Sequence, residues 1–295
     1  AVKAFYFNRA STELLEAHAG VYKRAAGHMG DKVYIHASAK SALRPEGSVI
    51  AAPKGWYDAG DYNLYVVNSG ISTYTLLAAY ESFGDYFKHQ HLNIPESDDD
   101  VPDLLNEIRW NLEWMLAMQD PNDGGVYHKL TSKNFSGFVM PANDISDRYV
   151  VQKTTAAALN FAATLAAASR VYAGYETQFP GFSATLLTAA KTAYDWAKAN
   201  PRIYYTQPAD ISTGTYGDGD VSDEFMWAAA ELYITTKIDS YYTDVNLANL
   251  TPDVPWWGGV KTLGLFSLAR HSAELTAVAE TAMIKTKLDS LATTI

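Results

Sequence analysis

The chain has 295 residues, a formal net charge of −10 and a sequence pI near 5.1. Such an acidic surface repels phosphates, so neither nucleic acid nor an anionic membrane is expected as a partner, whereas a neutral substrate would not be repelled. Hydrophobic residues make up 48% of the sequence, which is typical of a globular chain. Cysteine is absent, which excludes disulfides and thiolate metal sites.

No apolar run in the sequence approaches the roughly 20 residues that a membrane-spanning helix needs. The N-terminal stretch AVKAFYFNRAS does not have the form of a signal peptide. We therefore expect that the chain starts either as a mature protein or at an artificial boundary.

Apolar residues recur three and four positions apart through most of the chain, which predicts an all-α fold. The expected helices are 3–18, 70–83, 101–118, 152–172, 182–199, 222–236, 260–270 and 273–290. The segment 152–172 is nearly apolar all round and rich in alanine, as in a buried helix whose neighbours approach closely. No alternating pattern is long enough to predict a sheet domain.

Four of the links between the expected helices are long, namely 19–69, 119–151, 200–221 and 237–259, and they are rich in Gly, Pro, Trp, Tyr and Asp. Loops of this length inside a compact domain are usually functional. We therefore expect a ring of helices with short links at one end and functional loops at the other. No linker divides the chain, so we predict a single domain over residues 1–295.

The first candidate catalytic motif is GWYDAGDYN, which places Asp58 and Asp61 three residues apart. The glycines of this stretch disfavour a helix. Taken alone, the stretch could be a simple turn, because aspartate and glycine favour turns. Two neighbouring carboxylates also suit hydrolysis, because one can hold a water molecule while the other takes its proton. An inverting glycosidase places such a base about 6.5–9.5 Å from a carboxylic acid across the scissile bond.

The longer stretch PKGWYDAGDYNLYVVNSG resembles the signature of family 9 glycoside hydrolases, which are mostly inverting cellulases built on an (α/α)6 barrel. The resemblance extends from near residue 5 to about residue 270. The further matching stretches are AGHMGDKVYIHASA, DLLNEIRWNLEWMLAMQ, GGVYHK, GFVMP, SDRYVVQKTTAAALNFAATLAAASRVY, SDEFMWAAAELY and PWWGGVKTLGLFSLA. The sequence is most similar to the branch in which an immunoglobulin-like module precedes the catalytic domain.

The resemblance implies that Asp61 is the general base and that Asp58 helps to hold the attacking water. It also implies that His128 binds sugar hydroxyls next to the cleavage point, the alternative being a loop histidine without a special role. Arg148 is expected either to bond the substrate or to brace its loop. Leu64 stands where family members often have lysine, a departure that affects local packing more than the base.

Aromatic residues are candidates for the walls of a sugar-binding groove. Trp256 and Trp257 precede an expected helix, and an indole face can stack on the apolar face of a pyranose ring. Core packing is the alternative for either indole. Tyr216 is a weaker candidate for such a platform, and Trp56 is expected to pack beneath the two aspartates.

The stretch GDGDVSDEF gathers four carboxylates, which suits a hard cation such as calcium, although its spacing is not that of an EF-hand. The resemblance implies that Asp223 and Glu224 bind calcium together with backbone carbonyls just upstream. An aspartate that some members supply after the tryptophans is replaced here by Gly258 or Gly259. The alternative is a helix start capped by Ser222 with acidic residues in its first turn. No cofactor is expected for the chemistry itself.

The resemblance also implies a catalytic acid, which in the family is a glutamate near the C-terminal end of the domain. Nothing after PWWGGVKTLGLFSLARH resembles that motif, and eight or nine helices are visible where the barrel needs twelve. The expectation is an (α/α)6 barrel that is incomplete at its C-terminus, with the missing segment of the same domain as a partner.

The activity that the resemblance implies is inverting hydrolysis of β-1,4-glucosidic bonds in cellulose or a related β-glucan, by a secreted or periplasmic protein. One alternative is a β-glucan-binding barrel fragment without catalysis, because a base without an acid cannot protonate the leaving group. Another alternative is an exo-acting cellobiohydrolase or a β-glucosidase-like enzyme of the same family.

Overall fold

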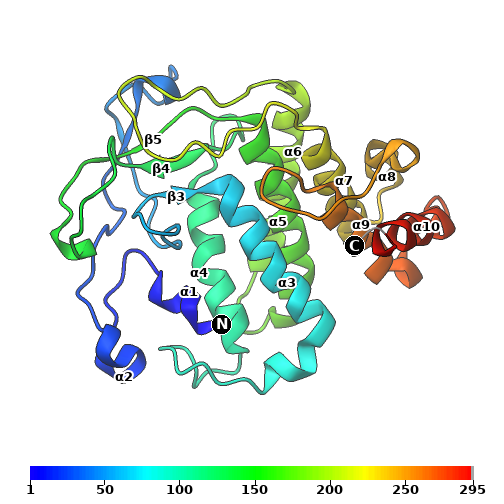
Figure 1. Ribbon diagram of the computed structural model, residues 1–295, viewed down its shortest axis with the longest axis horizontal. Coiled ribbons are helices and arrows are strands. Elements are labelled where there is room, and N and C mark those ends of the chain that lie inside the picture. Colours follow the sequence, from blue (N-terminus) through cyan, green and yellow to red (C-terminus); the bar gives the residue numbers. More distant parts are fainter. Residues whose placement is uncertain (294–295) are drawn as a thin grey trace.

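The computed structural model describes residues 1–293, and helices dominate it (Figure 1). The ten α-helices within these residues are α1 (Lys3–Phe7), α2 (Glu16–Ala19), α3 (Val66–Lys88), α4 (Asp103–Ala117), α5 (Thr155–Tyr172), α6 (Phe182–Ala199), α7 (Ser222–Thr236), α8 (Asp239–Val245), α9 (Lys261–Arg270) and α10 (Thr281–Ala292). Seven of the eight predicted helices correspond to α3–α7, α9 and α10. Among the described residues, no helix is both long enough and apolar enough to cross a membrane.

The prediction of one helix over 3–18 is wrong, because α1 ends at Phe7. The chain then runs extended, and the backbone of Arg9 pairs antiparallel with that of Trp56. The amide of Ala10 donates to the carbonyl of Gly55 at 2.8 Å. The apolar spacing of this segment therefore reflects burial against a distant loop. Tertiary pairing overrides the local helical pattern here.

A small five-stranded sheet lies within the long links, where the sequence predicted no strands. Its strands are β1 (Val33–Ile35), β2 (Val49–Ile50), β3 (Leu64–Tyr65), β4 (Lys129–Thr131) and β5 (Arg148–Val150), in the order β2-β1-β5-β4-β3. Only the β1–β5 pair is parallel among these strands. Strands of two or three residues are too short to show an alternating pattern, which explains why the sequence did not predict them.

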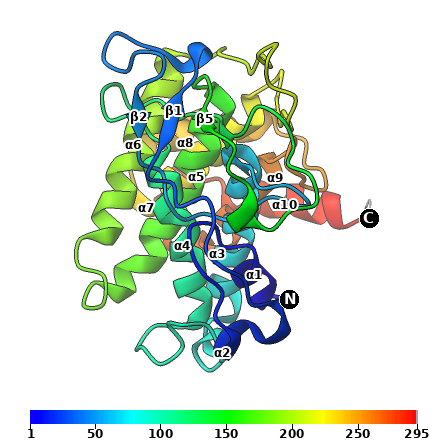
Figure 2. The ribbon, with the colours of Figure 1, turned by 90° about the vertical axis from the view of Figure 1, so that its left-hand side faces the viewer.

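The strands and the helices α1 and α2 lie toward opposite ends of the long helices. Figure 1 places β3, β4 and β5 beside the start of α3, and the view turned by 90° places β1, β2 and β5 at the same end (Figure 2). The sheet thus collects the links 19–69 and 119–151 at one end of the helices. This agrees with the expectation that long links gather at one end of the helices.

Helix α5 is the centre of the helical core, and it packs against α3, α6 and α7. All of its residues except Arg170 are buried. Alanine permits this packing because it adds little bulk, so that neighbouring helices approach closely. A Cβ atom on Gly70 of α3 would lie 3.0 Å from the side chain of Asn160 of α5. The prediction of a buried, alanine-rich helix is confirmed.

A buried group of charges joins α3, α5, α7 and α9. Arg170 donates to Glu81 at 2.8 Å and to Glu231 at 3.0 Å. Arg270 and His271 also contact Glu81. Burial alone would raise the pKa of Glu81, but its contacts with His271 and Arg170 lower it to about 2. Ion pairs thus link α5 to both α3 and α7, and α9 to α3.

We expect Arg170→Met to destabilise the fold by about 3–5 kcal/mol, because it leaves Glu231 buried without its counter-charge. The measurement is the free energy of unfolding from urea denaturation. Lys285→Met is the matched control, because the Lys285–Asp289 pair is largely exposed. An unchanged midpoint for Arg170→Met would contradict this role of the cluster.

Candidate active site

The turn that carries Asp58 and Asp61 lies directly before β3 and α3. Its shape depends on Gly55, whose φ of +84° is accessible mainly to glycine. A Cβ atom there would also lie 2.3 Å from the side chain of Leu64 and 2.8 Å from the ring of Trp114. Leu64 therefore packs against the base of the turn, which agrees with the expectation that this position affects packing.

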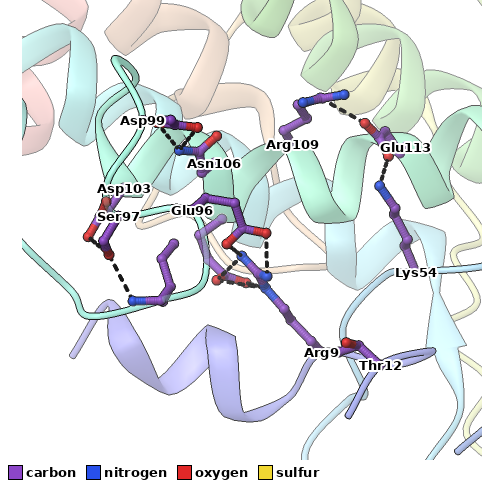
Figure 3. Close-up of polar contacts among 12 residues, drawn as sticks. Arg9, Thr12, Lys54, Glu96, Ser97, Asp99, Asp103, Asn106, Arg109 and Glu113 are labelled. Carbon is purple, nitrogen blue, oxygen red and sulfur yellow. Dashed lines mark hydrogen bonds and ion pairs between the residues drawn. The ribbon is translucent and has the colours of Figure 1, made fainter. Parts of the chain in front are cut away.

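A buried ion pair between Arg9 and Glu107 of α4 holds the start of the turn in place. Arg9 donates from Nε to Glu107 at 3.0 Å and from Nη1 to Glu96 at 2.9 Å, and the second of these contacts is visible in Figure 3. Glu107 is fully buried, and it also accepts a hydrogen bond from Nε1 of Trp56 at 2.7 Å. The position of Trp56, two residues before Asp58, is thus fixed by a charge on α4.

The residue before Gly55 is anchored as well. The ammonium group of Lys54 pairs with Glu113, which also pairs with Arg109 at 2.7 Å (Figure 3). The amide of Lys54 donates to the hydroxyl of Ser11 at 2.9 Å. Two ion pairs and the N-terminal segment together hold the chain as it enters the turn.

The carboxylate of Asp58 is held by two donors. Tyr216 donates its hydroxyl to Oδ2 at 2.7 Å, and Asn68 donates its amide to Oδ1. Burial, together with the nearby charge of Asp61, raises the pKa of Asp58 above its usual value. Asp58 lines a cleft of about 200 Å³ that Phe5 also lines.

The carboxylate of Asp61 is held by a separate pair of donors. Oδ1 accepts from the amide of Asn63 at 2.8 Å, and Oδ2 accepts from the hydroxyl of Tyr65 at 3.1 Å. The Tyr65 hydroxyl itself accepts from the amide of Gly214, also at 3.1 Å, so its one proton is directed to Asp61. Each carboxylate oxygen can accept more than one hydrogen bond, so both retain the capacity to bind water.

Three aromatic side chains lead away from Asp58 toward the surface. The ring of Tyr216 meets that of Trp257 at 5.1 Å and nearly at a right angle, and Trp257 meets Trp256 at 5.0 Å. Trp256 is 55% exposed. The structure thus brings together all three predicted aromatic residues, and Tyr216 bonds the candidate carboxylate as well.

His128 lies in the interior. Its Nε2 contacts the carbonyl of Thr215 at 2.6 Å, its Nδ1 contacts the hydroxyl of Thr154 at 2.8 Å, and its ring stacks on Tyr205 at 4.1 Å. Burial lowers the pKa of His128 to about 4. Both ring nitrogens are therefore used by protein groups, and this geometry favours a supporting role at the loop before Tyr216 over direct binding of a sugar.

Arg148, the first residue of β5, is also buried. It donates from Nη2 to the carbonyl of Tyr62, the residue that follows Asp61. Burial lowers the pKa of Arg148 to about 10. Of the two roles expected for this residue, the contacts favour bracing of the loop.

Lys129 is a site residue that the sequence analysis missed. It pairs with Tyr65 across β3 and β4, and its ammonium group donates to the hydroxyl of Thr213 at 2.9 Å and to the carbonyl of Gly214. Burial lowers the pKa of Lys129 to about 8, although the charge of Asp61 opposes this effect. Its only signal in the sequence is its place directly after His128 in the family-like stretch GGVYHK.

The predicted cation cluster assembles at the start of α7. Carboxylate oxygens of Asp218, Asp223 and Glu224 lie within 4.8 Å of one another. Glu224 is buried, and neither of its oxygens has a hydrogen-bond partner among the described residues. Burial is the main cause that raises the pKa of Glu224 well above its usual value, and contact with Asp223 raises it further. Three carboxylates so close together, one of them buried without such a partner, fit a hard cation.

The alternative of a capped helix start is confirmed only in part. Helix α7 begins at Ser222 and its N-cap residue, Val221, makes no side-chain cap bond, but Asp223 and Glu224 do lie in its first turn. The glycines after the tryptophans leave no room for the carboxylate that some family members have. A Cβ atom on Gly259 would lie 2.5 Å from the indole nitrogen of Trp256. Any cation here would rely on the three carboxylates and on backbone oxygens.

The helical architecture is consistent with a fold of the (α/α)-barrel type, in which the candidate carboxylates lie on loops. The chain belongs to glycosyl hydrolase family 9, whose sequence profile matches residues 1–294.

Curated relatives and solved structures agree with this membership. The chain is 48% identical over 284 residues to a xyloglucan-specific endo-beta-1,4-glucanase of Bacteroides ovatus, covering 93% of this chain and 48% of that protein. It is 32% identical over 274 residues to endoglucanase D of Acetivibrio thermocellus, with coverages of 90% and 42%. A Bacteroides ovatus GH9 structure superposes with a TM-score of 0.94 at 46% identity, over 98% of this chain and 55% of that chain. The chain thus spans about half the length of these relatives.

The burial of His128 predicts a dependence of stability on pH. The pKa of His128 is about 4 in the folded protein, against about 6.5 when it is unfolded, so the unfolded state binds more protons between these values. Stability should therefore fall as pH falls from 6.5 to 4, by up to about 3 kcal/mol from this residue. The check is thermal unfolding across this range. His128→Gln should flatten the curve, whereas His89→Gln, at an exposed histidine, should not.

Proposed function

We propose that this chain is part of an inverting glycoside hydrolase that cleaves β-1,4-glucosidic bonds in a β-glucan, with Asp61 as the general base. The observation that carries the proposal is the pair of aspartates on one turn, each held by its own two donors. Because Asp58 and Asp61 are both oriented before substrate arrives, little ordering remains to be done in the transition state.

In the proposed reaction, a water molecule bound between substrate and turn gives a proton to Asp61 and attacks the anomeric carbon. Asp58 accepts a second hydrogen bond from that water and so orients it. The bond to the leaving oxygen breaks as the new bond forms on the opposite face, and a carboxylic acid must protonate that oxygen. We propose that this acid comes from outside residues 1–295.

The aromatic chain from Tyr216 through Trp257 to Trp256 supports a polysaccharide substrate. Exposed indole rings bind the apolar faces of pyranoses, which are neutral and thus compatible with an acidic protein. The names of the relatives, a xyloglucan-specific endo-beta-1,4-glucanase and an endoglucanase, support a β-1,4-linked glucan backbone and cleavage within the chain.

In an active catalytic domain that contains these residues, Asp61→Asn should lower turnover by about 10²–10⁴-fold while binding of the glucan changes little. Asp98→Asn, at an exposed aspartate, is the control. ¹H NMR of the first products of the parent protein should show the α-anomer, because inversion changes the β-configuration. Near-full activity of Asp61→Asn would remove this residue from the role, and an initial β-anomer would contradict inversion.

We also propose that Asp218, Asp223 and Glu224 bind a structural calcium ion. Chelation should then lower the melting temperature, and added calcium should restore it. At a calcium concentration 100 times the dissociation constant, the free energy of unfolding should rise by about 2.7 kcal/mol. Glu224→Gln should abolish the calcium-dependent part, whereas Asp220→Asn, at an exposed carboxylate outside the cluster, should retain it. A melting temperature that does not respond to calcium would refute the site.

A further inference from the structure

The link between β4 and β5 exposes an unusual set of apolar side chains. Exposed large hydrophobic residues in this link are Phe135, Phe138, Val139, Met140 and Ile145. Apolar residues that gather on a surface commonly mark a binding site. Phe138 is the extreme case, because its side chain is fully exposed.

Part of this link faces the proposed base. A cleft of about 340 Å³ is lined on one side by Gly60, Asp61 and Tyr62 and on the other by residues 136–140. The exposed apolar residues 138–140 therefore border the space in front of Asp61. Ile145 is equally apolar and 93% exposed, but it does not line this cleft.

The link is attached to the catalytic turn at two points. The hydroxyl of Tyr62 donates to the carbonyl of Val139. Asp144 contacts His28 at 3.3 Å, and His28 contacts the hydroxyl of Tyr57 at 2.7 Å. Both contacts fix residues 136–140 relative to the turn, while the ring of Phe138 is left open to solvent.

The protonation states of Asp144 and His28 keep their contact intact near neutral pH. Burial would raise the pKa of Asp144, but hydrogen bonds from Ser136 and Ser146 lower it to about 2. Burial lowers the pKa of His28 to about 4, so its ring is neutral. The attachment is thus a hydrogen bond between an ionised carboxylate and a neutral imidazole.

We propose that residues 136–140 form one wall of the glucan-binding cleft, and that Phe138 stacks on a pyranose ring bound next to Asp61. The inference rests on the proposed function and adds a binding element to it. A neutral sugar suits this wall because its C–H face covers an aromatic ring while its hydroxyls stay in water. The wall is held close to the base, so a sugar that covers Phe138 is also held near the attacking water.

The test compares Phe138→Ala, Phe138→Tyr and Ile145→Ala in a protein that contains the whole catalytic domain. The substrate is a soluble cello-oligosaccharide or a xyloglucan oligosaccharide, and the readouts are KM, kcat and calorimetric binding. Phe138→Ala should raise KM and weaken binding by about 3–10-fold, as loss of an aromatic contact predicts, with kcat little changed. Phe138→Tyr keeps an aromatic ring and should bind as well as the parent. Ile145→Ala should also match the parent. Because the Phe138 side chain is fully exposed, thermal unfolding should be equal for all variants.

Two results would overturn the inference, and they differ in what they imply for the proposed function. If the parent hydrolyses the glucan and Phe138→Ala binds it equally well, the wall does not bind sugar, although the hydrolase function stands. If the parent neither binds nor hydrolyses any β-glucan, the proposed function fails and the inference fails with it.

Discussion

The antiparallel contact between the N-terminal segment and the turn before β3 is the constraint on which the candidate site depends. Arg9 carries its charge into the interior, where Glu107 is fully buried and accepts bonds from both Arg9 and Trp56. Removing either partner of such a pair leaves an uncompensated buried charge, which is costly. The turn with Asp58 and Asp61 is therefore fixed from behind by electrostatics, which leaves its carboxylates free to face the clefts.

The helices fix the geometry of the fold, whereas their ends and the links between them carry the site residues. Helix α5 and the charges around Arg170 fix α3, α7 and α9 relative to one another. The site residues then come from the ends of these helices and from the links between them. Asp58 is bonded by Asn68 of α3 and by Tyr216 of the link before α7, so its geometry depends on how α3 and α7 are placed relative to each other.

The sequence predicted most of the helices because a buried stripe leaves a periodic pattern, whereas 152–172 was predicted to be a buried helix from its apolar, alanine-rich composition. It failed over 3–18, where extended backbone pairs with a loop about fifty residues away. It also missed β1–β5, since strands so short carry no period. The candidate carboxylates Asp58 and Asp61 were found from local sequence and family resemblance. Their roles in catalysis remain proposals.

The partners of these carboxylates could not be predicted in the same way. Lys129 bonds Gly214, and Tyr216 bonds Asp58, through contacts that join distant parts of the chain, and no local pattern records such contacts. Tyr216 was predicted as an aromatic platform but not as a donor to Asp58. Tyr65 is only four residues from Asp61, but its short strand left no pattern that would mark it. His128 is the opposite case, a residue that the sequence singled out and whose contacts only the structure shows. Its type and position suggested a sugar ligand, and only its burial between Thr154 and Thr215 shows how both ring nitrogens are used.

The Arg9–Glu107 pair has a consequence for how the protein is made. The two residues are 98 positions apart, and a ribosome that adds about 5–20 residues per second needs about 5–20 s to make the chain between them. During that time the guanidinium of Arg9 lacks the carboxylate that compensates it in the fold, and the turn at 58–61 lacks its support. The N-terminal segment thus has to stay solvated and unpaired until α4 has been synthesised. This delay favours a short, polar segment after α1 over one that collapses early on its own.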